Sequence, residues 1–141
     1  MKEKYDKLIN MCKNGIALTQ ENIGNNMILV DRGTFQLIIP SDNSEEYGNF
    51  FINSFKGHDC YSYNSKSTHV YHVIDGSGEF IIGNKSIPVN PGGVITIGPN
   101  EIFAYKGKML LILEMTPNFK EENNYFVKNV DYDDDLKGIN K

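Results

Sequence analysis

Short runs of apolar residues alternate with polar segments along most of this chain. The runs that read as strands lie at 27–30, 34–40, 49–55 and 109–115. They are rich in β-branched and aromatic residues, which fit a pleated and half-buried surface. The turn signals between the later runs are Asp75-Gly76, Gly83-Asn84 and Pro91-Gly92-Gly93. Strand-like runs at this spacing predict an all-β sandwich or barrel.

The N-terminal residues follow a different period. Residues 3–13 carry apolar side chains at helical spacing with charges between them, and Gly15 follows. Because glycine is common just past the end of a helix, this segment predicts a short amphipathic helix. At 141 residues the chain is long enough for one domain with one core. We therefore expect an N-terminal helix and lead-in at 1–26, a barrel at 27–117, and an extension at 118–141 with a loose acidic end.

Composition excludes several classes of partner. The net charge is −4, and Arg32 is the only arginine, so neither nucleic acid nor an anionic membrane is an expected partner. The longest strongly apolar run, 109–113, is far shorter than the roughly 20 residues that span a bilayer. Cys12 and Cys60 form no CxxC pair, and the N-terminus has no signal-peptide pattern, so we expect reduced thiols and a cytoplasmic protein.

A stretch of roughly residues 50–117 resembles the two sequence motifs of the cupin family. The positions with the spacing of the first motif are Gly57, Tyr63, Ser65, His69 and Gly76. Those with the spacing of the second motif are Gly92, Gly98, Asn100, Phe103 and Gly107. The resemblance implies an antiparallel cupin-type β-barrel, or jelly roll, with the short helix added in front. It also implies a homodimer, since cupins often pair through sheet edges.

The metal ligands of that family are missing here. The three histidine positions of the motifs carry Tyr63, Ser65 and Phe103, and the glutamate position carries His69. We therefore expect no metal site and no cofactor. A substitute site built from the remaining histidines and a cysteine, His58, Cys60, His69 and His72, is opposed by strand alternation. His69 and His72 stand three apart and should face opposite sides of a strand.

Alternation also predicts which side chains face the barrel interior. If His69 keeps the inward direction of the family's glutamate, Tyr71 points inward too, while His72 points outward. The predicted ligand-binding residues are Tyr61, Tyr63, Ser65, His69, Tyr71, Phe103 and Tyr105. They describe an aromatic pocket with one imidazole and no carboxylate. Burial without a carboxylate should lower the pKa of His69 below its usual value of roughly 6.5.

Three functions fit this pocket. The first is a cupin that binds a small, sugar-like or weakly polar molecule without a metal. The second is a metal-free isomerase, epimerase or lyase, with His69 and Tyr63 as the catalytic acid–base pair. The third is a structural or interaction module in which side chains fill the barrel. A cavity among the aromatic residues would separate the third function from the first two.

Overall fold

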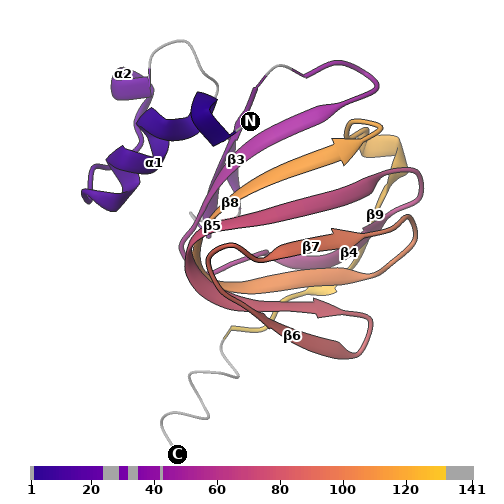
Figure 1. Ribbon diagram of the computed structural model, residues 1–141. Helices are drawn as coiled ribbons and strands as arrows, with labels where there is room; N and C mark the ends of the chain where they lie inside the picture. Colours follow the sequence, from indigo (N-terminus) through magenta and orange to yellow (C-terminus); the bar gives the residue numbers. More distant parts are fainter. Residues whose placement is uncertain (1, 24–28, 32–34, 42, 133–141) are drawn as a thin grey trace, which may run out of the picture.

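The computed structural model describes residues 2–23, 29–31, 35–41 and 43–132. The described residues form an antiparallel sheet that curls into a jelly roll, with a helical segment on its outside (Figure 1). The strands are β1 (Leu29–Asp31), β2 (Gln36–Pro40), β3 (Gly48–Ser54), β4 (Cys60–Asn64), β5 (Thr68–Ile82), β6 (Lys85–Val89), β7 (Val94–Ile97), β8 (Phe103–Thr116) and β9 (Asn124–Asn129). The helical elements are η1 (Lys2–Tyr5), α1 (Asp6–Lys13), α2 (Gln20–Ile23) and η2 (Glu121–Asn123). The predicted fold class and the N-terminal helix are confirmed.

Two long strands, β5 and β8, run through both layers of the roll. Their first contact joins Thr68 to Thr116 and their last joins Ile82 to Phe103. In one layer they lie beside β3 and β7, and in the other beside β4 and β6. The bend between the layers depends on glycine. Gly78 and Gly107 are paired, and a Cβ on Gly107 would lie 2.6 Å from the Cα of Gly78, closer than any side chain permits.

The sheet contributes to two apolar cores, one between its two layers and one beneath the N-terminal segment. Between the two layers lies a core that includes Phe50, Phe80 and Leu111. The outer face of β2, β3 and β8 packs under the N-terminal segment, where Leu8 and Ile9 of α1 are buried. This burial explains the helix, since an eight-residue helix is marginal in water by itself.

The sheet does not end at residue 117. β9 pairs antiparallel with β4 along its whole length, with a bulge between Tyr61 and Ser62. The first part of the predicted extension is therefore a strand of the roll. Positions 27 and 28 of the first predicted strand, and the acidic end at 133–141, lie outside the described residues. In the described part of the chain, no helix is long and apolar enough to cross a bilayer.

Candidate functional site

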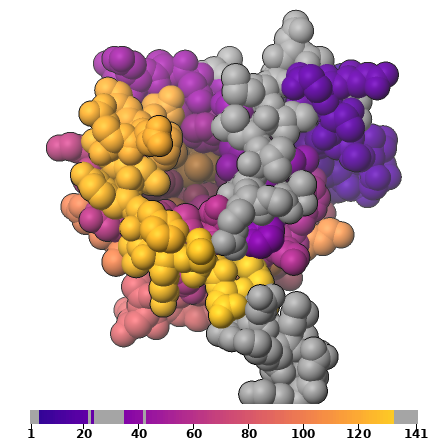
Figure 2. Space-filling view, turned by 180° about the vertical axis from the view of Figure 1, so that it is seen from behind, coloured from indigo at the N-terminus to yellow at the C-terminus, as the bar shows by residue number. Residues whose placement is uncertain are grey.

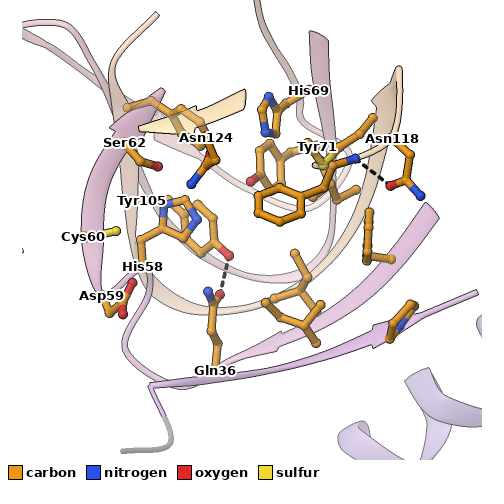
Figure 3. A pocket seen from close by; sticks show the side chains of 18 of the residues that line it. Gln36, His58, Asp59, Cys60, Ser62, His69, Tyr71, Tyr105, Asn118 and Asn124 are labelled. Carbon is orange, nitrogen blue, oxygen red and sulfur yellow. Dashed lines mark hydrogen bonds between the residues drawn. The ribbon is translucent and has the colours of Figure 1, made fainter. Parts of the chain in front are cut away.

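The roll is hollow between its two layers. A cavity of about 550 Å³ opens there, and its walls come from β2, β3, β4, β5 and β8. The segment that follows β8 closes one side, with Asn118, Phe119 and Asn124 (Figure 2; Figure 3). Such a volume lies within the range of pockets for small organic ligands. The barrel is therefore not filled by its own side chains.

Four predicted site residues line this cavity: His69, Tyr71, Phe103 and Tyr105. The ring of Tyr71 lies edge-on to that of Tyr105, with the centroids 5.4 Å apart, and the rings of His69 and Tyr71 are parallel at 6.1 Å. The Tyr105 hydroxyl donates a hydrogen bond to Oε1 of Gln36 on β2 (Figure 3). The pattern of alternate residues predicted the direction of these side chains because all four lie in regular strands.

The other three predicted residues, Tyr61, Tyr63 and Ser65, are not among those lining the cavity, and this part of the prediction is wrong. β4 turns Cys60 and Ser62 inward instead. Tyr63 stacks on Tyr125 of β9, with ring centroids 5.0 Å apart. The prediction assumed that every second residue from Tyr61 to His69 points inward. The segment at 65–67 is not a strand, so the alternation of side chains in β4 is not continuous with that in β5.

The same error of phase hid a second histidine. His58 lies just before β4 and lines the cavity, with its ring stacked on Tyr105 at a centroid distance of 4.2 Å. Figure 3 shows His58 and His69 reaching into the cavity from separate segments. His58 and Cys60 are two positions apart, so alternation places them on one face, and turning that face inward would have found both. Asp59 also lines the cavity, which corrects the expectation of no carboxylate there.

Both imidazoles are held in the neutral form. The pKa of His58 is lowered to about 4, chiefly by burial; the charge of Asp59 opposes this shift, and the neighbouring His69 adds to it. Burial likewise lowers the pKa of His69 to about 4, as predicted. Nδ1 of each ring is buried and has no hydrogen-bond partner within the described part of the chain. A buried polar atom without a partner is costly, so each Nδ1 is a natural contact for a ligand.

Tyr71 adds a hydroxyl that stays protonated. Burial raises its pKa well above the usual value near 10. It makes no hydrogen bond with any described residue, so its proton is available to a ligand. The hydroxyl of Tyr105 differs because its proton is already donated to Gln36. Of these two hydroxyls, that of Tyr71 is thus the donor offered to a ligand.

His72 belongs to the opposite face, as predicted. Its Nε2 lies 2.6 Å from Oε1 of Glu114, whose other oxygen accepts a hydrogen bond from Tyr47. In the described ranges, no cluster of three or more histidine, cysteine or acidic residues could hold a metal ion. His58, Cys60 and His69 share the cavity, and His72 does not.

The comparisons with known proteins point to one fold. No protein-family model and no curated protein matches the chain. Among solved structures, a Tyr→Phe variant of Streptomyces PAC13 with uridine has a TM-score of 0.73 at 20% identity, covering 84% of this chain and 94% of that one. Pac13 is described as a unique nucleoside dehydratase.

Two more distant structures agree with this likeness. An RmlC-like cupin from Shewanella frigidimarina has a TM-score of 0.59 at 17% identity and covers 70% of this chain and 88% of its own. Ectoine synthase from P. lautus has a TM-score of 0.60 at 14% identity, with coverages of 84% and 94%. These structures share the curled antiparallel sheet found here, and the chain has the cupin fold.

Proposed function

We propose that this protein is a dehydratase that acts on an uncharged nucleoside. The observation that carries the proposal is a match in residue type and spacing. In variants of PAC13 with uridine, a replaced histidine precedes one replaced tyrosine by thirteen positions, and a second replaced tyrosine follows thirty-four positions later. His58, Tyr71 and Tyr105 have the same order and the same two separations.

The three residues also meet in space. They come from the segment before β4, from β5 and from β8, yet all line one cavity. The ring centroid of Tyr105 lies 4.2 Å from that of His58 and 5.4 Å from that of Tyr71. A shared spacing in a shared fold, with the residues assembled at one cavity, favours a shared role over coincidence. Of the functions that the sequence left open, this supports the lyase, with His58 in place of the predicted pair.

The chemistry of a dehydration suits a neutral imidazole. The reaction breaks a C–H bond and a C–O bond on neighbouring carbons and releases water. His58 takes the proton from a carbon whose C–H bond is made acidic by an electron-withdrawing neighbour in the substrate, and the electron pair of that bond forms the new C=C bond as the hydroxyl leaves. Burial lowers the pKa of His58, so the imidazolium that forms is unstable in the cavity and returns the proton to the departing hydroxyl. The hydroxyls of Tyr71 and Tyr105 would hold the sugar while this proton moves.

The lining of the cavity favours an uncharged ligand. No lysine or arginine lines it in the described part of the chain. Among the described lining residues, a phosphate or carboxylate group would therefore meet no cationic side chain, and burying an anion without one is costly. The aromatic rings suit a flat base, and the side-chain amide of Asn124 points into the cavity, where it can donate and accept (Figure 3). A nucleoside fits these features better than a nucleotide.

The test is a comparison of uridine with uridine monophosphate. We expect uridine to shift NMR signals of His58, Tyr71 and Tyr105, and the phosphate ester to bind at least about tenfold more weakly. Mass spectrometry of a nucleoside panel incubated with the protein should then find a product that has lost one water. Tighter binding of the monophosphate, or turnover that survives His58→Gln unchanged, would contradict the proposal.

A further inference from the structure

The C-terminal segment runs beside the chain that carries His58. β9 pairs with β4 from Asn124 opposite Asn64 to Asn129 opposite Cys60. The contact then continues past the end of the strand. The N–H of Val130 donates to the carbonyl of Asp59 at 2.9 Å, and the hydroxyl of Tyr132 donates to the carbonyl of His58 at 2.7 Å. Tyr132 is thus joined to His58 across 74 positions of sequence.

His58 needs such an anchor because it lies outside the regular strand. Gly57 before it has a φ of +127°, a conformation that side chains rarely adopt, and β4 begins only at Cys60. The N–H of His58 donates to the carbonyl of Tyr105 at 2.9 Å. Its carbonyl has the Tyr132 hydroxyl as partner. These two bonds fix the peptide planes on both sides of His58, and so they fix the direction in which its side chain leaves the backbone.

Tyr132 is itself held in place. Its ring meets that of Phe35 edge-on, with centroids 5.1 Å apart and planes at 82°. Nζ of Lys106 lies 5.6 Å from the ring centroid. Its hydroxyl packs so close to the backbone that a Cβ on Gly57 would lie 2.6 Å from it. The hydroxyl therefore has little freedom to move away from the His58 carbonyl.

We propose that Tyr132 is a positioning residue for His58, and that the C-terminal segment completes the site. Tyr132 does not line the cavity, so it acts through the backbone of His58 rather than on a ligand. The kinetic part of this inference rests on the proposed dehydratase function. The structural part concerns only the orientation of the His58 ring, and it can be tested whether or not the protein turns over a nucleoside.

The structural test compares Tyr132→Phe with Tyr125→Phe in the full-length chain. Each variant loses one hydroxyl of the same C-terminal segment, but Tyr125 contacts the outer Tyr63 ring and not the backbone of His58. With histidine labelled in the ring, NMR should show the His58 signals moved or broadened in Tyr132→Phe, while the His69 signals stay. In Tyr125→Phe both sets should stay. His58 signals that are unchanged in Tyr132→Phe would overturn the proposal, as would equal changes at His58 and His69.

The kinetic test uses the dehydration reaction. A hydrogen bond of ordinary strength is lost in Tyr132→Phe, so we expect kcat to fall about tenfold with KM little changed. Phe35→Leu is a second variant, which keeps the Tyr132 hydroxyl but removes the edge-on contact that holds the Tyr132 ring. It should lower kcat in the same way, by a smaller factor. A rise in KM with kcat intact would overturn the positioning role. If no nucleoside is turned over at all, the proposed function fails while the NMR result still decides this inference.

Discussion

The two histidines of the cavity are held in opposite ways. His69 lies inside β5, with Met115 of β8 opposite it on one side and Ile97 of β7 on the other. Its direction follows from the pleat, and only 6% of its surface is exposed. His58 lies before β4, and hydrogen bonds from distant parts of the chain hold its backbone. The residue in the regular strand could be oriented from the sequence, and the residue in the irregular segment could not.

Under the proposed function, this difference separates the histidine that moves the proton from the one that does not. In a regular strand the pleat fixes the direction of each side chain. In an irregular segment the backbone can adopt other conformations, so a side chain can point in directions that a strand does not allow. The histidine that matches the spacing of the PAC13 variants is the irregular one. Both rings are neutral, and each presents a buried Nδ1 without a partner in the described chain, so neither protonation state nor hydrogen bonding shows which histidine moves a proton. Substituting each histidine in turn distinguishes their roles.

The largest effect should come from exchanging each histidine for glutamine, which keeps a donor and an acceptor but cannot carry a proton. We expect His58→Gln to lower kcat by at least about a hundredfold, the usual contribution of a general base, with uridine binding kept. His69→Gln should change uridine affinity more than kcat. Steady-state kinetics and calorimetric titration measure the two quantities. The reverse pattern would mean that His69 moves the proton, as the sequence first suggested.

In the stability of the fold, by contrast, the two histidines should behave alike. Each has a pKa of about 4 when folded, against roughly 6.5 when unfolded, so the unfolded chain binds more protons between these values. Stability should therefore be full above about pH 6.5 and fall as the pH drops towards 4, by roughly 3 kcal/mol for each histidine. Urea unfolding at several pH values measures this. The double variant His58→Gln with His69→Gln should lose most of that dependence, and an unchanged profile would contradict the burial of both rings.

The two cavity tyrosines both lie in regular strands, so a comparison of them isolates the effect of one hydrogen bond. Tyr105→Phe removes a hydrogen bond between buried groups, to Gln36, and should cost about 1–2 kcal/mol of unfolding free energy. Tyr71→Phe removes a hydroxyl without a partner in the described chain and should stay within about 0.5 kcal/mol. Chemical denaturation of the two variants provides the measurement. Equal losses would show that the Tyr71 hydroxyl also has a structural partner.

The smallest effect on ligand binding is expected on the outer side of β4. Tyr63→Ala removes the stacking on Tyr125 and should cost about 1 kcal/mol or less of stability. Uridine binding should remain as in the unchanged protein, because Tyr63 does not line the cavity. Ser62→Ala is the matched change on the inner side of the same strand, and it should alter binding. A loss of uridine binding in Tyr63→Ala alone would restore the inward direction first predicted for it.

The sequence by itself determined the fold class, the N-terminal helix and the inward side chains of β5 and β8. The periods that encode them are local, and regular backbone carries the alternation over many residues. Homodimerisation, drawn from the family resemblance, stays a prediction. Only the tertiary structure decided which face of β4 turns inward, and with it the position of His58 in the cavity. The phase of β4 depends on the positive φ of Gly57, on the bend at 65–67, and on pairing with β9, which lies sixty or more residues later in the sequence. A periodic pattern cannot be carried across such interruptions, because each one resets the direction of the side chains that follow.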